Sequence, residues 1–167
     1  ADADAIVHQL LLPKGKAFSE VSRLFPDSMK AGMIDRGRLG MIVFADRTKL
    51  KQLEKILHPK VRASMKAIIR RAIAQRRRRV ILEIPLLYET GADAICDQVV
   101  VVTAPAFIQR QRVMARPGMT KEKFREILAF QLPDREKRKR ADVIIPTGLG
   151  RAFSQRRARL VQAHSGA

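Results

Sequence analysis

The chain has 167 residues, a mass of 18.9 kDa and a formal net charge of +18, with 34 lysines and arginines against 16 aspartates and glutamates. This length fits one domain with a small inserted subdomain, and the hydrophobic content of 46% is enough to bury a core. The composition therefore argues against a wholly disordered chain. The charge favours polyanionic partners, but it does not distinguish nucleic acid, acidic membrane and phosphorylated metabolites.

The sequence contains no run of about eighteen apolar residues and no signal-peptide pattern, so nothing in it argues for membrane insertion or export. Cys96 is the only cysteine and cannot form an internal disulfide, which fits a reducing compartment. We therefore expect a cytoplasmic protein with no membrane partner, in which Cys96 is a small buried hydrophobe.

The first half of the chain has the apolar spacing of helices. The expected helical segments are Ala5–Leu12, Val21–Phe25, Leu39–Phe44 and a stretch that Asp46 can cap. The buried face of that last stretch comprises Leu50, Leu53, Ile56 and Leu57. Pro59 is expected to end this helix and to start another. Residues 5–76 are too long for an ordinary crossover, so they are predicted to form a helical subdomain.

The second half alternates short apolar strands with helical patterns. Strands are expected at Val80–Ile84, Gln98–Thr103 and Val143–Ile145, and helices at Phe107–Arg116, Thr120–Gln131, Arg135–Arg140 and Leu149–Gln162. Apolar strands separated by helices indicate a parallel sheet covered on both faces, hence an α/β fold with three layers. Ligands of such sheets bind at the carboxyl ends of the strands. The crevice is therefore expected around Asp2 and Asp4 and the segments that follow Ile84 and Thr103.

Asp2-Ala3-Asp4 lies where an extended segment is expected to give way to a helix. In an extended conformation both carboxylates point to one side, where they could accept a hydroxyl proton and help to hold hydrated Mg²⁺. The alternative is that Asp4 is only the N-cap of the helix that starts at Ala5. His8, one turn later, could pair with Asp4, or it could be a structural or solvent-facing histidine.

The Leu57-His58-Pro59 junction is a candidate anion site. His58 is expected at a helix N-terminus, where backbone N–H groups favour an anion, and Arg62 could add a charge-assisted contact to phosphate. The alternative is a structural helix junction with a capping histidine.

The segment Pro85–Glu89 follows an expected strand at its carboxyl end. Its apolar residues, Pro85 and Leu86 among them, suit the organic part of a substrate, and Glu89 could fix a polar end. The segment could equally be a hydrophobic link between a strand and a helix.

Arg110, Arg112 and Arg116 are expected on one helix, and the spacing of four puts Arg112 and Arg116 on a shared face. This pattern is typical of a mobile lid whose guanidinium groups stabilise a transferring phosphoryl group. The alternative is a solvated basic helix face. Gln131 continues the apolar face of the next helix and is expected to point inward.

The basic runs Arg76–Arg79 and Arg135–Arg140 are the best case for nucleic-acid binding. The first lies in a turn and the second contains Glu136. One Tyr, seven Phe and no Trp leave few aromatic side chains for base stacking. We therefore expect solvated surface in both runs and no specific nucleic-acid partner.

The order of these segments resembles that of the dephospho-coenzyme A kinases, a family of phosphate-loop kinases. The matching landmarks, which extend to about Gly148, are Asp2-Ala3-Asp4, Gly32-Met33-Ile34-Asp35-Arg36 with Leu39 and Phe44, Leu57-His58-Pro59, Pro85-Leu86-Leu87-Tyr88-Glu89, Gln109–Arg116, Met119-Thr120, Gln131 and Ala141-Asp142. The Asp-Ala-Asp opening, the Leu-His-Pro segment and the Pro-Leu-Leu-x-Glu segment together make the resemblance specific.

The resemblance implies a nucleotide-binding core in residues 1–148, with an acceptor-binding subdomain at 5–76 and a lid at 107–131, followed by a C-terminal helix and tail at 149–167. It implies transfer of the ATP γ-phosphoryl group to the ribose 3′-hydroxyl of dephospho-coenzyme A, the last step of coenzyme A synthesis, assisted by Mg²⁺. Asp4 matches the family's catalytic base. Arg112 and Arg116 match the lid arginines that meet the nucleotide, and Arg112 is also expected to act in catalysis. The expected substrate-binding residues are Asp2, His8, His58, Arg62, Pro85, Leu86 and Glu89, with no dedicated metal ligand.

The family's phosphate loop has no match in the chain. No G-x-x-x-x-G-K-[ST] pattern occurs in the 167 residues, and the resemblance places it before residue 1, beside the first strand of the sheet. Without it the β- and γ-phosphates lack their cradle, so we expect this chain by itself to be inactive or nearly so. Ile145-Pro146-Thr147-Gly148 also departs from the Asn and Gly that the family commonly has on the adenine side.

Three other functions remain open. The chain could be another small-molecule phosphate-loop kinase, a basic domain that binds RNA or DNA, or a non-catalytic remnant that keeps only the acceptor site. Binding of dephospho-coenzyme A at physiological salt, compared with nucleoside monophosphates and a short oligonucleotide, separates the first two from the resemblance. The remnant would bind coenzyme A without turnover.

Overall fold

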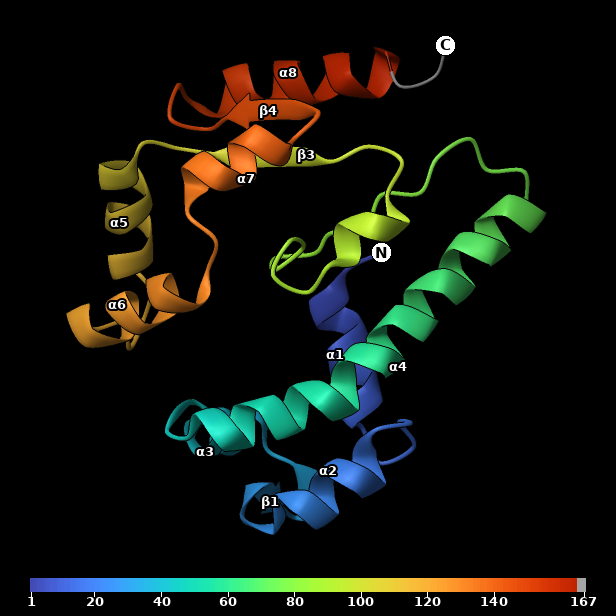
Figure 1. The fold of residues 1–167 in the computed structure, drawn as a ribbon, viewed down its shortest axis with the longest axis vertical. Helices are drawn as coiled ribbons and strands as arrows, with labels where there is room; N and C mark the ends of the chain where they lie inside the picture. The colour runs from blue at the N-terminus through green and yellow to red at the C-terminus, as the bar shows by residue number, and fades with distance from the viewer. Residues whose placement is uncertain (165–167) are drawn as a thin grey trace. The chain divides into compact units, whose positions relative to one another are not determined.

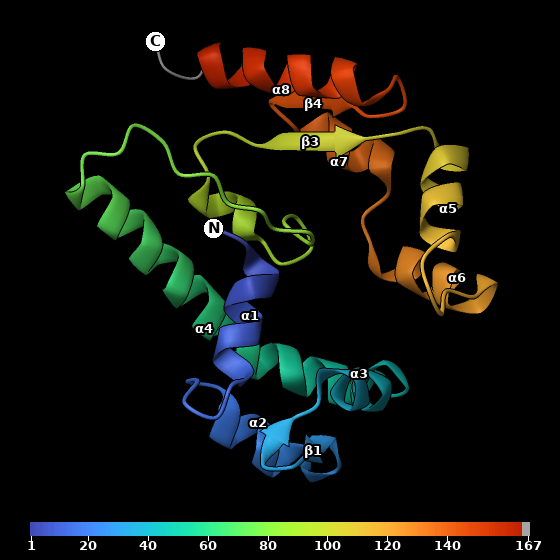
Figure 2. The same cartoon turned by 180° about the vertical axis from the view of Figure 1, so that it is seen from behind.

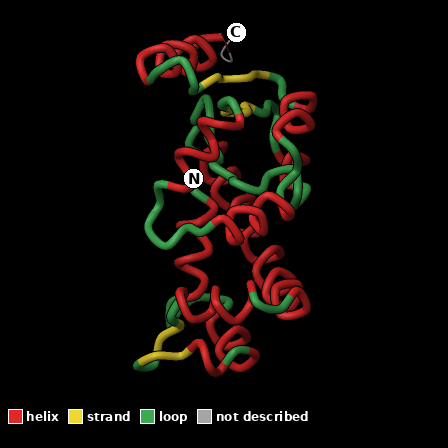
Figure 3. Tube along the Cα trace, turned by 90° about the vertical axis from the view of Figure 1, so that its left-hand side faces the viewer, coloured by secondary structure: helices red, strands yellow, loops and turns green. Residues whose placement is uncertain are grey.

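The computed structural model describes residues 1–164. The chain divides into two compact units, Ala1–Pro85 and Leu86–Ala167. Figure 1 labels the elements of both units along the chain, and Figure 3 shows that helices predominate over strands in the part of the chain described.

The first unit is mainly helical. Its helices are α1 (Ala3–Leu11), α2 (Phe18–Leu24), the 3₁₀ turn η1 (Pro26–Ser28), α3 (Arg36–Phe44) and α4 (Arg47–Ala74). Two short strands, β1 (Met29–Lys30) and β2 (Met33–Ile34), form an antiparallel hairpin between η1 and α3. Asp35 caps α3 and Asp46 caps α4, each by accepting hydrogen bonds from backbone N–H groups of the first turn. The cap predicted at Asp46 is thus confirmed.

One apolar cluster holds the four helices of the first unit together. Its buried members are Leu10, Leu11, Ala17, Val21, Phe25, Leu39, Val43, Leu53 and Leu57. The members on α3 and on α4 are four residues apart, so that one stripe of each helix faces the cluster. Leu53 and Leu57 are buried as predicted, and Leu50 and Ile56 pack against the cluster. The Lys60 ammonium lies 2.7 Å from the Glu20 carboxylate and joins α4 to α2 at the surface.

The predicted helix junction at Pro59 is wrong, because α4 continues from Arg47 to Ala74 with Pro59 inside it. Proline lacks the N–H that would bond to the carbonyl four residues earlier, and its ring crowds that carbonyl, which bends a helix. Figures 1 and 2 show α4 changing direction between its teal and green parts. Buried Leu57 before the proline and Met65 after it keep both halves packed. His58 is therefore not at a helix N-terminus, so the free backbone N–H groups expected there to favour an anion are not present.

The strand predicted at Val80–Ile84 is reduced to one parallel bridge, between Asp2 and Glu83. The Ala3 N–H donates to the Glu83 carbonyl at 3.0 Å, and the Glu83 N–H donates to the Ala1 carbonyl at 2.7 Å. The pairing ends there because the chain enters α1 at Ala3 and a turn at Pro85. An apolar run can predict an extended segment, but the length of a strand depends on its partner.

The second unit is built on two parallel strands. Its elements are the 3₁₀ turn η2 (Ala92–Ile95), β3 (Val100–Thr103), α5 (Ala106–Met114), α6 (Lys121–Phe130), α7 (Asp134–Arg140), β4 (Val143–Pro146) and α8 (Arg151–His164). β3 and β4 pair in parallel, with Val100 opposite Val143 and Thr103 opposite Pro146. α8 packs on β4 and α7 packs on β3. Figure 2 shows these two helices on opposite faces of the strand pair, so the predicted three-layer α/β arrangement is confirmed.

Three local predictions in the second unit need correction or qualification. α5 ends at Met114, so Arg116 lies beyond the helix and does not share its face with Arg112. Gln131 is exposed, because α6 ends at Phe130 and Gln131 is extended. β3 keeps Val100 39% and Val102 63% exposed on one of its faces. Among the described residues, no helix is both long and apolar enough to cross a membrane.

We predict that Leu57→Ala lowers the free energy of unfolding by about 2–4 kcal/mol, because it leaves a cavity in the helical cluster. Leu57 is 8% exposed. The control is Ile73→Ala in the same helix, where the side chain is 69% exposed and the change should stay within about 0.5 kcal/mol. Urea unfolding followed by circular dichroism measures both variants. Equal losses would contradict the packing described for α4.

Candidate active site

The N-terminus of α1 is fixed by Asp2. Its carboxylate accepts hydrogen bonds from the backbone N–H of Asp4 at 2.8 Å and of Ala5 at 3.4 Å. Asp2 is therefore the N-cap, and the suggestion that Asp4 caps the helix is wrong. Asp4 is already helical, so the two carboxylates do not alternate along an extended segment either. Once the Asp2 carboxylate is turned onto the backbone, only Asp4 of the pair is left for chemistry.

The Asp4 carboxylate lies in the first helical turn and is exposed. Within residues 1–164 it makes no hydrogen bond or ion pair that would occupy its oxygens. In the parallel bridge between Asp2 and Glu83 the two backbones run in the same direction. Asp4 and Pro85, each two residues further along the chain, therefore lie at the same end of the bridge. Within the first unit, Asp4 thus lies at the same end of this bridge as Pro85, the first residue of the segment predicted after Ile84.

His8 is the next polar residue along this side of α1, one turn after Asp4. Its Nδ1 lies 3.2 Å from Arg36 Nη1, at the start of α3. A guanidinium can only donate, so the imidazole Nδ1 accepts this hydrogen bond. The pairing of His8 with Asp4 that the sequence allowed is not the one formed. Arg36 was not among the predicted site residues, although it closes the Gly32–Arg36 segment.

His58 and Arg62 lie in the middle of α4, four residues apart and therefore on one face. His58 is half-buried and Arg62 is exposed. Both side chains come from the continuous helix α4, with Pro59 between them, whereas the predicted junction would have placed them at the start of a helix.

Arg112 lies on α5 and reaches the segment that follows β4. Its Nη1 donates to Thr147 Oγ1 at 3.1 Å, and its Nη2 donates to the Thr147 carbonyl at 2.8 Å. The Thr147 hydroxyl donates in turn to the carbonyl of Thr103, the last residue of β3, at 2.9 Å. Arg112 is therefore held at the carboxyl ends of both parallel strands, where ligands of α/β sheets bind.

Arg116 lies in the turn between α5 and α6, where the Met119 N–H donates to its carbonyl at 3.2 Å. Gly118 in this turn has φ of 70°, a left-handed conformation that favours glycine. The two helices enclose a groove lined by Arg110, Met114, Lys121, Phe124, Arg125 and Leu128. The segment predicted to be a lid thus forms a helical hairpin, and its groove is lined by three apolar and three cationic residues.

Glu89 is held by two partners, one from the segment between α6 and α7 and one from α7. Its carboxylate accepts the Leu132 N–H at 2.7 Å and lies 2.8 Å from the Lys137 ammonium. Its side chain is 15% exposed, although the residue as a whole lies at the surface. Burial opposes the charged form, but the bonds from Lys137 and Leu132 outweigh it, so the pKa of Glu89 lies below its ordinary value. These contacts fix the segment that begins at Pro85.

Leu86 and Tyr88 give the same segment an outer and an inner side. Leu86 is 37% exposed, whereas the Tyr88 hydroxyl is buried and has no hydrogen-bond partner in the described part of the chain. Burial, followed by the charges of Asp93 and Asp142, raises the pKa of Tyr88. The Arg140 guanidinium lies over the Tyr88 ring, 5.7 Å from its centre. Tyr88 therefore anchors the segment, and Leu86 is left available for contact.

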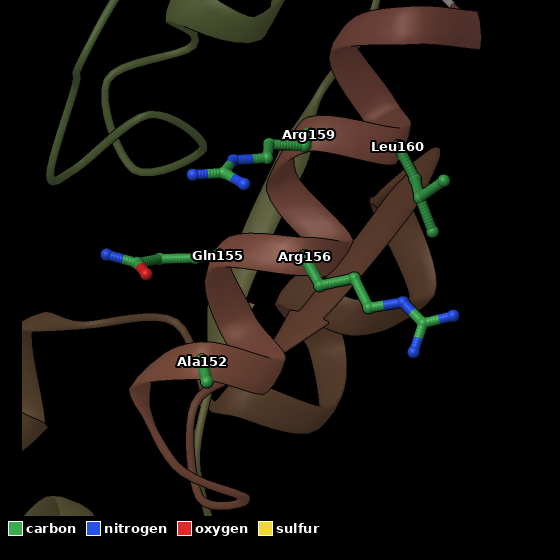
Figure 4. Close-up of a pocket in the computed structure, with 5 residues that line it drawn as sticks. All are labelled: Ala152, Gln155, Arg156, Arg159 and Leu160. Atoms are coloured by element: carbon green, nitrogen blue, oxygen red, sulfur yellow. The ribbon is translucent and has the colours of Figure 1, made fainter.

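A further hollow lies on α8, and its lining residues are Ala152, Gln155, Arg156, Arg159 and Leu160. Figure 4 shows that all five come from this one helix, with the Arg156 and Arg159 side chains directed apart. Polar groups do not converge in it, so it is not the catalytic site. Among the described residues, no group of three or more His, Cys, Asp or Glu side chains could hold a metal ion.

Solved structures place the fold in a class. A crystal structure from Thermus thermophilus matches 97% of this chain and 82% of its own, with a TM-score of 0.77 and 34% sequence identity. The dephospho-CoA kinase from Campylobacter jejuni matches 98% of this chain and 83% of its own, with a TM-score of 0.66 and 31% identity. The fold is therefore that of a kinase of the phosphate-loop class.

The sequence comparisons narrow the class to a family. The family model described as dephospho-CoA kinase matches residues 1–149. The dephospho-CoA kinase of Mesorhizobium japonicum is 50% identical over 149 residues, which cover 89% of this chain and 75% of the relative. That of Rhodospirillum rubrum is 47% identical over 169 residues, covering 99% of this chain and 80% of the relative. The chain belongs to the dephospho-CoA kinase family, whose members are ATP-dependent phosphotransferases.

We predict that Glu89→Gln lowers the free energy of unfolding at neutral pH by about 1–3 kcal/mol, because a charge-assisted hydrogen bond and an ion pair are lost. The pKa of Glu89 in the folded state is depressed from 4.5, so its contribution is fully present above that pH and is lost as the pH falls below it. Urea unfolding at neutral and at acid pH measures the difference between wild type and variant.

The control for this prediction is Glu136→Gln, which breaks the more exposed pair with Lys139 and should cost at most about 1 kcal/mol. A difference between wild type and Glu89→Gln that stays the same in acid would contradict the ionic role of Glu89.

Proposed function

We propose that the protein transfers the γ-phosphoryl group of ATP to the ribose 3′-hydroxyl of dephospho-CoA. The observation that carries this proposal is the Asp4 carboxylate, which is exposed, free of partners in the described part of the chain, and fixed in the first turn of α1. Family membership supports ATP-dependent phosphoryl transfer. A carboxylate beside the attacking hydroxyl is the group that such a transfer needs as a proton acceptor.

In the proposed reaction the ribose 3′-oxygen attacks the γ-phosphorus of ATP. The bond between that phosphorus and the oxygen bridging it to the β-phosphorus breaks, and ADP leaves. Asp4 takes the proton of the attacking hydroxyl, so the products are ADP, the 3′-phosphorylated acceptor and one transferred proton. Asp2 contributes by holding the helix start on which Asp4 stands.

The acceptor requires both polar and apolar contacts, because it carries a diphosphate and a long organic arm. We assign polar contacts to His58 and Arg62, which share one face of α4. Pro85 and exposed Leu86 are assigned to the organic arm. Glu89 holds their segment in place through Lys137 and Leu132, which supports an indirect contribution to acceptor binding.

The nucleotide phosphates require cations that meet the charge of the transition state. We assign this role to Arg112, which Thr147 orients at the ends of β3 and β4, and to Arg116 in the lid turn. The formal charge of +18 suits two polyphosphate substrates. The 167 residues contain no G-x-x-x-x-G-K-[ST] motif, so no residue of the chain is assigned to a phosphate loop.

Mg²⁺ fits the residues present. This ion is usually bound through one or two carboxylates together with substrate phosphates and water, not through a cage of protein ligands. The unpartnered Asp4 carboxylate supplies one such oxygen donor, and ATP supplies the phosphates. When bound, Mg²⁺ would neutralise charge on the β- and γ-phosphates. The single cysteine fits the reducing cytoplasm in which we expect the reaction to occur.

We predict that Asp4→Asn lowers kcat by about 100- to 10,000-fold, because the amide cannot take the hydroxyl proton. KM for dephospho-CoA should change by less than about threefold, because Asn keeps the size and most hydrogen bonds of Asp. Steady-state ADP release by the whole enzyme measures both constants. Asp27→Asn, which alters another exposed acid in a first helical turn, should leave kcat unchanged. Equal kcat in the two variants would remove Asp4 from the chemistry.

Acceptor binding tests the proposed substrate directly. A calorimetric titration of the folded chain with dephospho-CoA at physiological salt should give saturable binding. A nucleoside monophosphate should bind more weakly, and a short oligonucleotide should show no comparable saturable binding at that salt concentration. Preference for the monophosphate would favour another small-molecule kinase, and retained oligonucleotide affinity would favour a nucleic-acid-binding domain.

A further inference from the structure

Arg36 is the first residue of α3, and its guanidinium is held by an imidazole and not by a carboxylate. Nη1 donates to His8 Nδ1 at 3.2 Å, across from α3 to α1. The adjacent carboxylate, Asp35, is committed to the helix cap, where it accepts the Arg38 N–H at 3.0 Å. None of the ion pairs formed within residues 1–164 includes Arg36. Its orientation is thus set by a partner that leaves its positive charge uncompensated.

This arrangement differs from an arginine that serves only the fold. An arginine that is paired with a carboxylate has its charge and part of its donors satisfied within the fold. Here one guanidinium nitrogen is used and the others remain available, since arginine has five N–H donors in a planar fork. Arg36 is also exposed. A fixed, uncompensated and accessible guanidinium is suited to bind a dianionic or diphosphate group.

The position of His8 relates this cation to Asp4. The two residues are four apart on α1, so their side chains lie on one face, about 5–6 Å apart at Cβ. Arg36 therefore stands beside the helix face from which the Asp4 carboxylate projects. In dephospho-CoA the hydroxyl that reacts is on C3′ of the ribose. Three carbons, C3′, C4′ and C5′, and one oxygen separate it from the 5′-diphosphate. A diphosphate one helical turn from Asp4 is within that reach.

We propose that Arg36 binds the diphosphate of the acceptor and that His8 is the residue that positions it. The proposal rests on the proposed function, since it takes Asp4 as the group beside the ribose 3′-hydroxyl. It makes the Asp4–His8 face of α1 and the start of α3 one acceptor subsite, with a proton acceptor at one end and a diphosphate contact at the other.

The first test is the affinity of Arg36→Ala for dephospho-CoA, measured by calorimetry at physiological salt. We expect a loss of about 10- to 100-fold, the range for a charge-assisted hydrogen bond. Arg38→Ala is the matched control, because it removes the same charge from the same exposed helix without touching His8. Its loss should stay below about threefold. Equal losses in the two variants would mean that only the general positive field acts, and would overturn the proposal.

A second ligand separates contact from folding. Adenosine keeps the ribose and the base but lacks the diphosphate, so its weak binding, followed by ligand-detected NMR, should be unchanged by Arg36→Ala. Loss of adenosine binding together with dephospho-CoA binding would show a damaged site and would refute a diphosphate contact. Circular dichroism melting of each variant accompanies the titrations.

The positioning role of His8 is tested by rescue. His8→Ala should weaken dephospho-CoA binding by about 3- to 10-fold, because Arg36 loses its fixed orientation but keeps its charge. His8→Gln should recover most of that affinity, since the amide oxygen can accept from the guanidinium. Equal affinities of the Ala and Gln variants, both below wild type, would contradict positioning through a hydrogen bond.

The proposed acceptor site and the proposed contact between Arg36 and the diphosphate are refuted by different results. If the wild-type chain does not bind dephospho-CoA, the proposed acceptor site fails and Arg36 with it. If the wild type binds and Arg36→Ala binds equally well, the proposed function stands and only the diphosphate contact is refuted.

Discussion

The geometry of the candidate site depends on how Asp2 uses its backbone and its side chain at once. Its backbone belongs to the parallel bridge with Glu83, while its carboxylate turns back to cap α1. Because both interactions involve one residue, the chain changes from extended at Asp2 to helical at Ala3, the next residue. Asp4 is thereby placed in the first helical turn with an unoccupied carboxylate. An Asp2 that was extended but did not cap would leave the first N–H groups of α1 without a partner and the turn that carries Asp4 less firmly held.

Two cationic side chains, Arg36 and Arg112, differ from the general positive charge of the protein because hydrogen bonds orient them. Most of the 34 cationic side chains add only to a general field, which speeds the arrival of anions and is screened by salt. Arg36 and Arg112 differ because hydrogen bonds to His8 and to Thr147 fix where their guanidinium groups lie. Neither partner carries a negative charge, so orientation is gained without neutralising the cation. Fixed cations distinguish one phosphate position from another, which a diffuse field does not.

Local patterns predicted the parts of the structure that local forces determine. The cap at Asp46 and the buried residues Leu53 and Leu57 follow from spacing and side-chain type alone. The path of α4 through Pro59 did not follow, because packing on both sides of the proline outweighs the loss of one hydrogen bond. The strand expected before Pro85 is only a single bridge in the structure, because the length of a strand depends on a partner distant in sequence. In the site, Asp4 was predicted, but the bond between His8 and Arg36 joins residues 28 positions apart, and no spacing rule indicates it.

The bridge at Glu83 has one more consequence, which concerns how such proteins can diverge. The helical excursion, which is the segment between the two bridge partners, leaves the paired backbone at Ala3 and returns to it at Glu83. Hydrogen bonds of 3.0 Å and 2.7 Å join the two ends of this segment. Since departure and return coincide, the excursion can lengthen, shorten or change its lining without shifting the strands it springs from. The helices that follow the first turn of α1 can then change in sequence while the paired residues and Asp4 keep their places.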